Sequence, residues 1–202
     1  MHICVEGVNG SGKTTLIKNL SKLGYKTLSS PNGTNLAKYI RPACRGTDQW
    51  GDLSEMVKFL LFSAARCDEF DKLIKDCDDI ILCDRWHFST WVYQHKLGNI
   101  PLELYEMSIS KNEKIDCVFI LGGDSDKLID RVIAEREKNP SHGICSWTQE
   151  RETMKKINDI YKNELPLYLK SKNINYLCID TIQNNADQVQ TIIENYILGK
   201  HM

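Results

Sequence analysis

The chain has 202 residues, a length that fits one domain of ordinary size with a substantial apolar core. Lys and Arg number 26 against 27 for Asp and Glu, so the overall charge favours neither nucleic acid nor a membrane surface as a partner. The sequence shows no apolar leader and no run of about 18 apolar residues, which predicts a soluble, cytoplasmic protein that does not span a membrane.

Eight cysteines are present, but none forms a C-x-x-C pair or stands at zinc-finger spacing to a histidine. In an intracellular protein disulfides are not expected. Cys4, Cys83, Cys117 and Cys178 each lie inside an apolar strand-like run. We therefore interpret these four as small buried hydrophobic residues rather than metal ligands or a redox pair.

Short apolar runs alternate with helical patterns along the chain, which is typical of a parallel sheet joined by crossover helices. Strands are expected at 1–6, 25–29, 79–83, 116–121 and 175–179. Helical patterns cover 13–23, 47–75, 102–110, 125–137, 148–169 and 186–198. The pattern predicts one α/β domain over residues 1–202, with a five-stranded parallel sheet between two helical layers. A Pro/Gly-bearing stretch at 138–145 suggests a small lid at about 136–150.

The first strand runs into GVNGSGKT at residues 7–14, which meets the P-loop pattern G-x-x-x-x-G-K-S/T in full. Its glycines let successive backbone N–H groups face a polyphosphate, and the following helix adds its positive end. Lys13 is expected to reach the β- and γ-phosphates as a catalytic cation, and the Thr14 hydroxyl to bind Mg²⁺. The expected ATP contacts are Gly7, Asn9, Gly10, Ser11, Gly12, Lys13, Thr14 and Thr15.

A second motif follows the apolar run 80–83, which ends in Asp84 and Arg85. Ligands of open α/β sheets bind beyond the carboxyl ends of the strands, so this pair is expected beside the P-loop. Asp84 would orient Mg²⁺ or its water, and Arg85 would grip a second phosphate with its guanidinium fork. A surface salt bridge is the alternative for such a pair, but the P-loop makes a catalytic role the better interpretation.

Residues 84–94, which read DRWHFSTWVYQ, resemble the D-R-Y-x-x-S-S-x-A-Y-Q segment of thymidylate kinases. Residues 59–66 (FLLFSAAR) are similar to the L-L-F-x-A-x-R helix of that family, and Pro31 to Arg41 resembles its P-G-G-T loop and helix. With the P-loop, four motifs stand in the order of the family.

This resemblance implies a three-layer P-loop kinase that transfers the γ-phosphate of ATP, with Mg²⁺, to dTMP or a related pyrimidine deoxynucleotide such as dUMP or a modified base. It also implies a homodimer. Arg66 and Arg85 would flank the acceptor phosphate, Phe62 would stack on the base and Thr90 would hydrogen-bond it. Tyr93 would select against a ribose 2′-hydroxyl. Gln94 closes the same segment, and Arg41 would reach the acceptor.

One departure from the family pattern is Ser29-Ser30 before Pro31, where one branch of the family has Arg-Glu, and three others bear on the site. Asn9 replaces a usual aspartate and so lacks its charge. The P-loop has no arginine at Gly10, which in the family goes with catalytic arginines in the lid, and we choose Arg136 as that cation over a merely solvated helix face. Trp86 and Trp91 suggest a reshaped acceptor pocket, hence uracil or a modified pyrimidine as the base.

Two alternatives stay open. A deoxynucleoside kinase, or a kinase of a modified base, could use the same fold, although the Pro31 loop and Asp84-Arg85 argue against the former. A non-catalytic P-loop nucleotide-binding regulator is the other, although the sequence has no N-K-x-D segment and retains Lys13 and Thr14.

Overall fold

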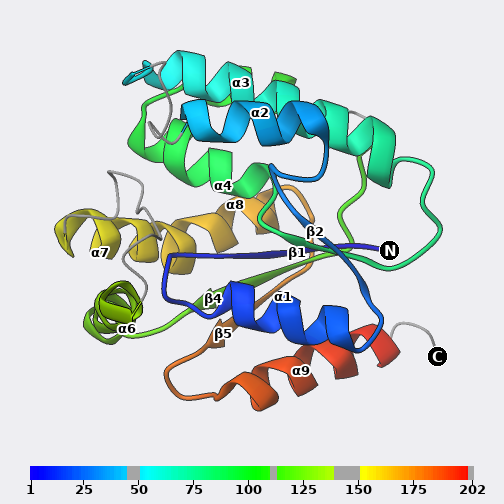
Figure 1. The fold of residues 1–202 in the computed structure, drawn as a ribbon, viewed down its shortest axis with the longest axis vertical. Coiled ribbons are helices and arrows are strands. Elements are labelled where there is room, and N and C mark those ends of the chain that lie inside the picture. The colour runs from blue at the N-terminus through cyan, green and yellow to red at the C-terminus, as the bar shows by residue number, and fades with distance from the viewer. Residues whose placement is uncertain (45–50, 110–112, 139–150, 200–202) are drawn as a thin grey trace.

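The structure is a computed structural model that describes residues 1–44, 51–109, 113–138 and 151–199. The described residues form a five-stranded parallel sheet in the order β2-β3-β1-β4-β5 (Figure 1). Every expected strand is confirmed to within about two residues, the usual uncertainty of element ends. The strands are β1 (His2–Gly7), β2 (Lys26–Ser29), β3 (Ile81–Asp84), β4 (Cys117–Gly122) and β5 (Tyr176–Asp180).

One face of the sheet is covered by α1 (Lys13–Lys22) and α9 (Ala186–Gly199), drawn below it in Figure 1. Alternation along β1 explains this packing, because successive side chains of a strand point to opposite faces. Ile3 and Val5 join the cluster that α1 and α9 cover, whereas Cys4 belongs to the cluster on the other face. The expected helices at 13–23 and 186–198 are therefore confirmed.

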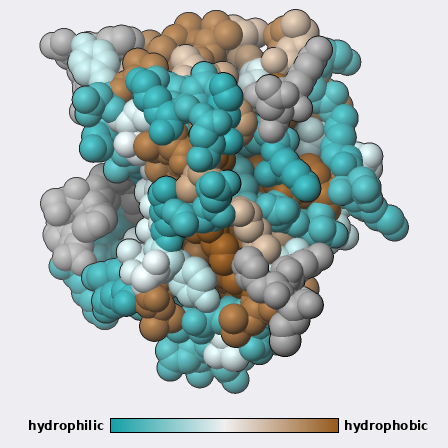
Figure 2. All heavy atoms as spheres, turned by 90° about the vertical axis from the view of Figure 1, so that its right-hand side faces the viewer, coloured by the Kyte–Doolittle hydropathy of each residue, from teal (hydrophilic) through white to brown (hydrophobic). Residues whose placement is uncertain are grey.

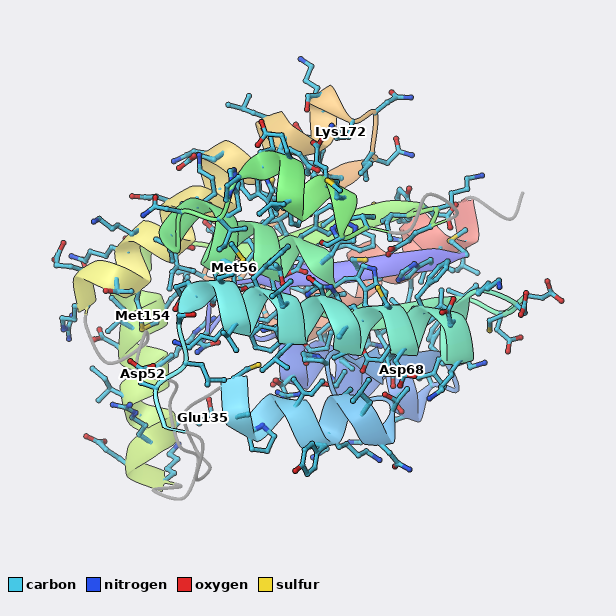
Figure 3. All side chains as sticks on the ribbon, turned by 90° about the horizontal axis from the view of Figure 1, so that it is seen from above. Asp52, Met56, Asp68, Glu135, Met154 and Lys172 are labelled. Carbon is cyan, nitrogen blue, oxygen red and sulfur yellow. The ribbon has the colours of Figure 1, made fainter. Side chains whose placement is uncertain are left out.

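The other face carries most of the remaining helices, with α3 and α2 farthest from the sheet, whereas α6 lies beyond the carboxyl end of β4 (Figures 1 and 3). Figure 3 shows α2 and α3 side by side, with Met56 at the end of α3 toward α6 and α7 and Asp68 near the other end. Within the described residues, three π-helical segments, named η, continue or join the helices. The elements are α2 (Asn35–Cys44), α3 (Glu55–Glu69), η1 (Phe70–Ile74), α4 (His87–Thr90), η2 (Trp91–Leu97), α5 (Leu102–Met107), α6 (Ser125–Lys138), α7 (Arg151–Asp159), η4 (Ile160–Glu164) and α8 (Leu165–Ser171).

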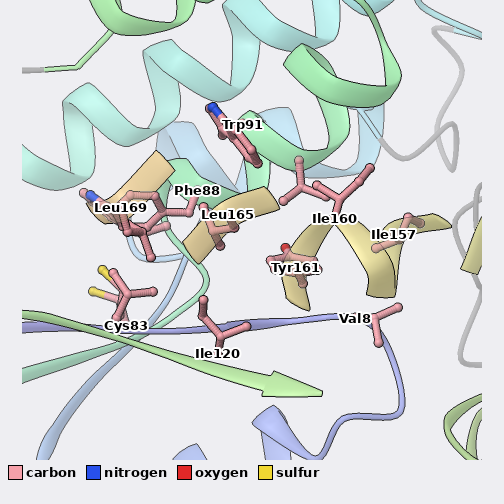
Figure 4. Close-up of a cluster of buried hydrophobic side chains, with 14 of the residues drawn as sticks. Val8, Cys83, Phe88, Trp91, Ile120, Ile157, Ile160, Tyr161, Leu165 and Leu169 are labelled. Atoms are coloured by element: carbon pink, nitrogen blue, oxygen red, sulfur yellow. The ribbon is translucent and has the colours of Figure 1, made fainter. Parts of the chain in front are cut away.

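Most helices of this layer bury their apolar side chains in one shared cluster against the sheet. Figure 4 shows the cluster in close-up, with Tyr161 between Ile160 of its own segment and Ile120 of β4. The expected helical stretch 148–169 is α7, η4 and α8 in succession, because the π-helical turn shifts the buried face. Of the expected stretch 47–75, residues 47–50 lie outside the described residues and 51–54 are not helical. The helix α3 begins at Glu55, where the Ser54 hydroxyl caps it by accepting a hydrogen bond from the Val57 N–H.

Two features differ from expectation or lie outside the described residues. Cys178 is exposed rather than buried, because β5 is an edge strand whose outer face is only partly covered. The proposed lid at about 136–150 lies outside the described residues except for its first three positions. Within the described ranges, no helix has the length and apolar character needed to cross a membrane.

The carboxyl ends of β1 and β3 lie side by side, since Val5 pairs with Asp84 in the parallel register. Asp84-Arg85 therefore lies next to the loop that follows β1, as the sequence predicts. The opposite edge of the sheet, with the N-terminus, faces the viewer in Figure 2, where hydrophobic patches alternate with hydrophilic side chains.

Candidate active site

The loop between β1 and α1 has the backbone of a phosphate-binding turn. Gly7 and Gly10 adopt positive φ angles of 143° and 78°. A Cβ at Gly7 would lie 2.1 Å from the Leu121 carbonyl oxygen, and one at Gly10 would lie 2.4 Å from that of Leu128. Only glycine fits either position, because both the backbone angle and the neighbouring carbonyl exclude a side chain.

Lys13 begins α1, and its ammonium group lies buried against the loop. Its Nζ donates hydrogen bonds to the Val8 carbonyl oxygen at 2.8 Å and to the Ser11 hydroxyl at 3.3 Å. Burial, together with the positive charge of Arg85, lowers the pKa of Lys13 to about 7. The negative charge of an approaching polyphosphate would therefore stabilise the ammonium form of Lys13.

A cavity of about 570 Å³, named here the donor hollow, opens beside this loop. Seven of the eight expected ATP contacts line it; Gly7 does not, but its carbonyl oxygen accepts a hydrogen bond from Arg85. Asp84 and Arg136 also line it. Thr14 and Asp84 offer oxygen ligands of the kind Mg²⁺ prefers, and within the described ranges no larger group of metal-ligating side chains occurs.

The far wall of the donor hollow consists of residues that sequence reasoning missed. Arg131 of α6 donates to the Thr181 carbonyl oxygen at 2.8 Å, and Asn184 and Asn185 lie beside them. Only the order of the elements could have indicated these residues, because α6 follows β4 and Thr181 directly follows β5. Both segments thus reach the carboxyl edge of the sheet, where ligands of such folds bind.

Arg85 reaches the loop from the end of β3 and is held by several acceptors. Its Nη2 donates to Asn9 Oδ1 at 2.8 Å, and its Nη1 lies 3.2 Å from the Gly7 carbonyl oxygen. Its guanidinium carbon lies 5.8 Å from the centre of the Tyr93 ring, within cation–π range. Asn9 and Arg85, which the sequence places 76 residues apart, therefore form one cluster.

A second, smaller cavity of about 150 Å³, the acceptor hollow, meets the first at Arg85. All seven expected substrate-binding residues line it, so the structure brings them together, and their roles stay predictions. Asn9, Ser30, Arg41 and Arg85 line both hollows. The lining is completed by Pro31, Cys44, Lys58, Phe62, Arg66, Trp86, Ser89, Thr90, Tyr93 and Gln94.

Within the acceptor hollow, Arg66 contacts the hydroxyl of Thr90 rather than the phosphate-binding loop. Its Nη1 donates to the Thr90 hydroxyl at 2.5 Å, and its Nη2 donates to the Ser63 hydroxyl at 3.4 Å. Burial lowers the pKa of Arg66 from its ordinary value. The guanidinium thus stands with Thr90, the residue expected at the base, whereas Arg85 stands with the phosphate-binding loop.

Three charged residues around the acceptor hollow escaped sequence reasoning. Lys58 lies one helical turn before Phe62 on α3 and pairs with Glu55 at 3.1 Å. Buried Glu69 accepts hydrogen bonds from the Ser30 hydroxyl at 2.6 Å and the Gly33 N–H at 2.6 Å. Buried Glu6 accepts one from the Trp86 N–H at 2.7 Å. A buried acid needs such hydrogen-bond donors. The sequence alone does not show which acidic residue will be buried beside them.

Comparison with known proteins gives a consistent result. A family model described as thymidylate kinase matches residues 5–193. The chain is 32% identical over 171 residues to a thymidylate kinase of Acholeplasma laidlawii, covering 80% of this chain and 83% of that one. It is 28% identical to a thymidylate kinase of Prochlorococcus marinus, covering 98% of each. A crystal structure of thymidylate kinase from Ehrlichia chaffeensis shares the fold, with a TM-score of 0.71, 21% identity and 98% coverage of each chain.

Proposed function

The chain belongs to the thymidylate kinase family, and from that premise we propose that it transfers the γ-phosphoryl group of ATP to dTMP or a closely related pyrimidine deoxynucleotide. It is an ATP-dependent nucleoside monophosphate kinase. The products are ADP and the deoxynucleoside diphosphate.

One observation carries the proposal: the donor hollow and the acceptor hollow share Asn9 and Arg85. A triphosphate on the P-loop and a monophosphate in the acceptor hollow therefore meet at one guanidinium. Phosphoryl transfer depends on such positioning and on neutralising phosphate charge, more than on covalent chemistry of the protein.

In the reaction, an acceptor phosphate oxygen attacks the γ-phosphorus, and the bond from that phosphorus to the bridging β-oxygen breaks. The electron pair of that bond leaves on ADP. Lys13 neutralises charge on the β- and γ-phosphates, and Arg85 holds the acceptor phosphate in line. No general base is needed, because the phosphate oxygen is already ionised near neutral pH.

Thr14 and Asp84 would hold Mg²⁺ in the donor hollow, and the ion would supply further charge neutralisation between the phosphates. Arg136, at the end of α6, lines the same hollow and is proposed as a cation that faces the transferred group. The donor base would lie along Arg131, Thr181 and Asn184.

At the acceptor end, Phe62 would stack on the base, and Tyr93 would limit space at the ribose 2′ position. We assign Arg66 to the base rather than to the phosphate, because its guanidinium contacts Thr90. Thr90 and Gln94 complete the polar lining, and Arg41 approaches the acceptor phosphate. An arginine donor favours bases with a carbonyl group at C4, namely thymine and uracil, over cytosine.

Two further parts of the proposal concern the protein in the cell. A homodimer is supported by apolar side chains exposed on α2 and α3, among them Leu36, Tyr39 and Leu60. A cytoplasmic location is supported by the free thiols of the described cysteines, since oxidising compartments favour disulfides.

The test is ADP and diphosphate production from ATP and Mg²⁺ with dTMP, dUMP, dCMP and 5-modified dUMP, and with thymidine as an unphosphorylated acceptor. The proposal expects dTMP or a uracil-type monophosphate to be phosphorylated best. Preference for thymidine would point to a deoxynucleoside kinase. ATP binding without acceptor-dependent ADP release would point to a regulator without transfer activity.

A further inference from the structure

Glu6 is the last residue before the phosphate-binding loop and is wholly buried. Its Oε1 accepts hydrogen bonds from the backbone N–H groups of Trp86 at 2.7 Å and Ser89 at 3.2 Å. Its Oε2 accepts from the Ser89 hydroxyl at 2.7 Å and from the Tyr161 hydroxyl at 3.1 Å. Since these contacts enclose both oxygens and Glu6 lines neither hollow, the carboxylate touches no substrate.

The same two hydroxyls also contact Arg85. Its Nη1 lies 3.1 Å from the Ser89 oxygen and 3.2 Å from the Tyr161 oxygen. A carboxylate only accepts and a guanidinium only donates. The Ser89 and Tyr161 oxygens also lie 3.1 Å apart, so the Tyr161 hydroxyl donates its proton either to Glu6 or to Ser89, which in turn donates to Glu6. In both arrangements the two oxygens turn lone pairs toward Arg85, so the carboxylate sets the direction of both hydroxyls.

The remaining contacts of Arg85 fit this arrangement. Asn9 Oδ1 accepts a hydrogen bond from Nη2 at 2.8 Å. Among the contacts of the described residues, this leaves the Nε–H and one Nη2 hydrogen for a phosphate. The backbone of Arg85 has a φ of 67°, in the left-handed region that strains a non-glycine residue. Such a conformation is retained where several surrounding contacts hold the residue in place.

We propose that Glu6 and Tyr161 are positioning residues for the transfer reaction, and that they aim Arg85 at the acceptor phosphate through the Ser89 and Tyr161 hydroxyls. This inference rests on the proposed function, since it concerns the phosphate that Arg85 binds. It assigns a role to a buried acid of β1 and to a tyrosine 155 residues later in the chain.

Tyr161 is the informative member of the network. Its ring is wholly buried in the core above the sheet (Figure 4), and only its hydroxyl joins the polar cluster. The π-helical turn η4 brings both Ile160 and Tyr161 onto the buried side. Tyr161→Phe would therefore keep the packing and remove only one of the two hydroxyl oxygens that link Glu6 to Arg85.

Tyr105→Phe is the matched control. Tyr105 is also wholly buried, and its hydroxyl lies 2.6 Å from His87 Nδ1, so Tyr105→Phe likewise removes a buried hydroxyl that has polar partners. We expect both variants to lose similar thermal stability. Only Tyr161→Phe should lower kcat/KM for dTMP, by about tenfold or more, while KM for ATP changes less than about twofold. Ser89→Ala supplies a second measurement in case Tyr161→Phe folds poorly.

A double-mutant cycle separates positioning from an independent effect. In an Arg85→Lys background, Tyr161→Phe should cost less than about twofold, because the guanidinium it positions is gone. The same loss in both backgrounds, or no loss in the Arg85 protein, would overturn the inference. Failure of the unaltered protein to phosphorylate any pyrimidine monophosphate would instead overturn the proposed function.

Discussion

The donor and acceptor hollows are built in opposite ways. The donor side is local: one loop and the start of α1 supply most of its expected phosphate contacts, mainly through the backbone and Lys13. The acceptor side is assembled from α2, α3, β3 and the α4–η2 segment, and its two central arginines are fixed by hydroxyl and amide side chains. Triphosphate binding thus depends on a contiguous motif, whereas acceptor selection depends on long-range packing.

The largest effect on the donor side is expected from Lys13→Ala. Removing the cation that faces the β- and γ-phosphates should lower kcat on the order of a hundred- to a thousand-fold. The measurement is steady-state ADP production with saturating dTMP. Lys18→Ala, an exposed cation on the same helix, is the control and should leave kcat unchanged. A mild effect of Lys13→Ala would remove the basis for the donor assignment.

On the acceptor side the corresponding change is Arg85→Lys. A lysine keeps the charge but cannot hold two phosphate oxygens with a planar fork, so kcat/KM for dTMP should fall on the order of a hundredfold. KM for ATP should change less than about threefold. Arg151→Lys, on an exposed arginine paired with Asp126 and Asp130, is the control. An equal rise of both KM values would mean that the two hollows are not separable.

The lowered pKa of Lys13, about 7, predicts a pH dependence of the donor side alone. A bound triphosphate stabilises the ammonium form and raises this pKa, so binding above pH 7 takes up a proton. Affinity for ATP should therefore weaken as pH rises from 7 to 9, by at most about tenfold per unit. Calorimetry at pH 8 in buffers of different ionisation enthalpy should report uptake approaching one proton. Lys13→Met should abolish it, and unchanged uptake in that variant would contradict the assignment.

A smaller effect is expected where Lys58 lines the acceptor hollow. Lys58→Met removes a cation that lies one turn from Phe62 and pairs with Glu55. KM for dTMP should rise a few-fold, on the order of one lost charged contact, with kcat nearly unchanged. Lys38→Met, on an exposed lysine of α2, is the control. No change with any acceptor would place Lys58 among purely structural residues.

The donor and acceptor sides also differ in how far the sequence predicts them. The strands, α1 and the loop with Lys13 were predictable because their signals are local: apolar runs, glycine spacing and a helical period. The approach of Asp84 to the loop followed from parallel-sheet topology alone. The acceptor residues could be grouped in advance only through the resemblance to a family, since nothing local in α3 or in residues 84–94 says that they face each other.

What could not be predicted is the network of buried acids. Glu6 reads as one polar residue at the end of an apolar strand, and Glu69 as one of several acids on a helix. Their partners, Ser89 and Tyr161 for the first and the Ser30 to Gly33 loop for the second, are distant in sequence. The contact between Arg66 and Thr90 could not be predicted for the same reason. Its position depends on where Thr90 arrives after α3 packs on α4, which is a tertiary outcome.

The most direct test of the central claim, two phosphate sites that meet at Arg85, is the affinity of a compound in which adenosine and thymidine are joined by five phosphates. If the two hollows form one continuous site, this compound should bind at least about a hundredfold more tightly than ATP or dTMP alone, because linking the halves avoids a second loss of freedom. Arg85→Lys should remove most of that gain. Affinity no better than that of ATP would contradict the claim.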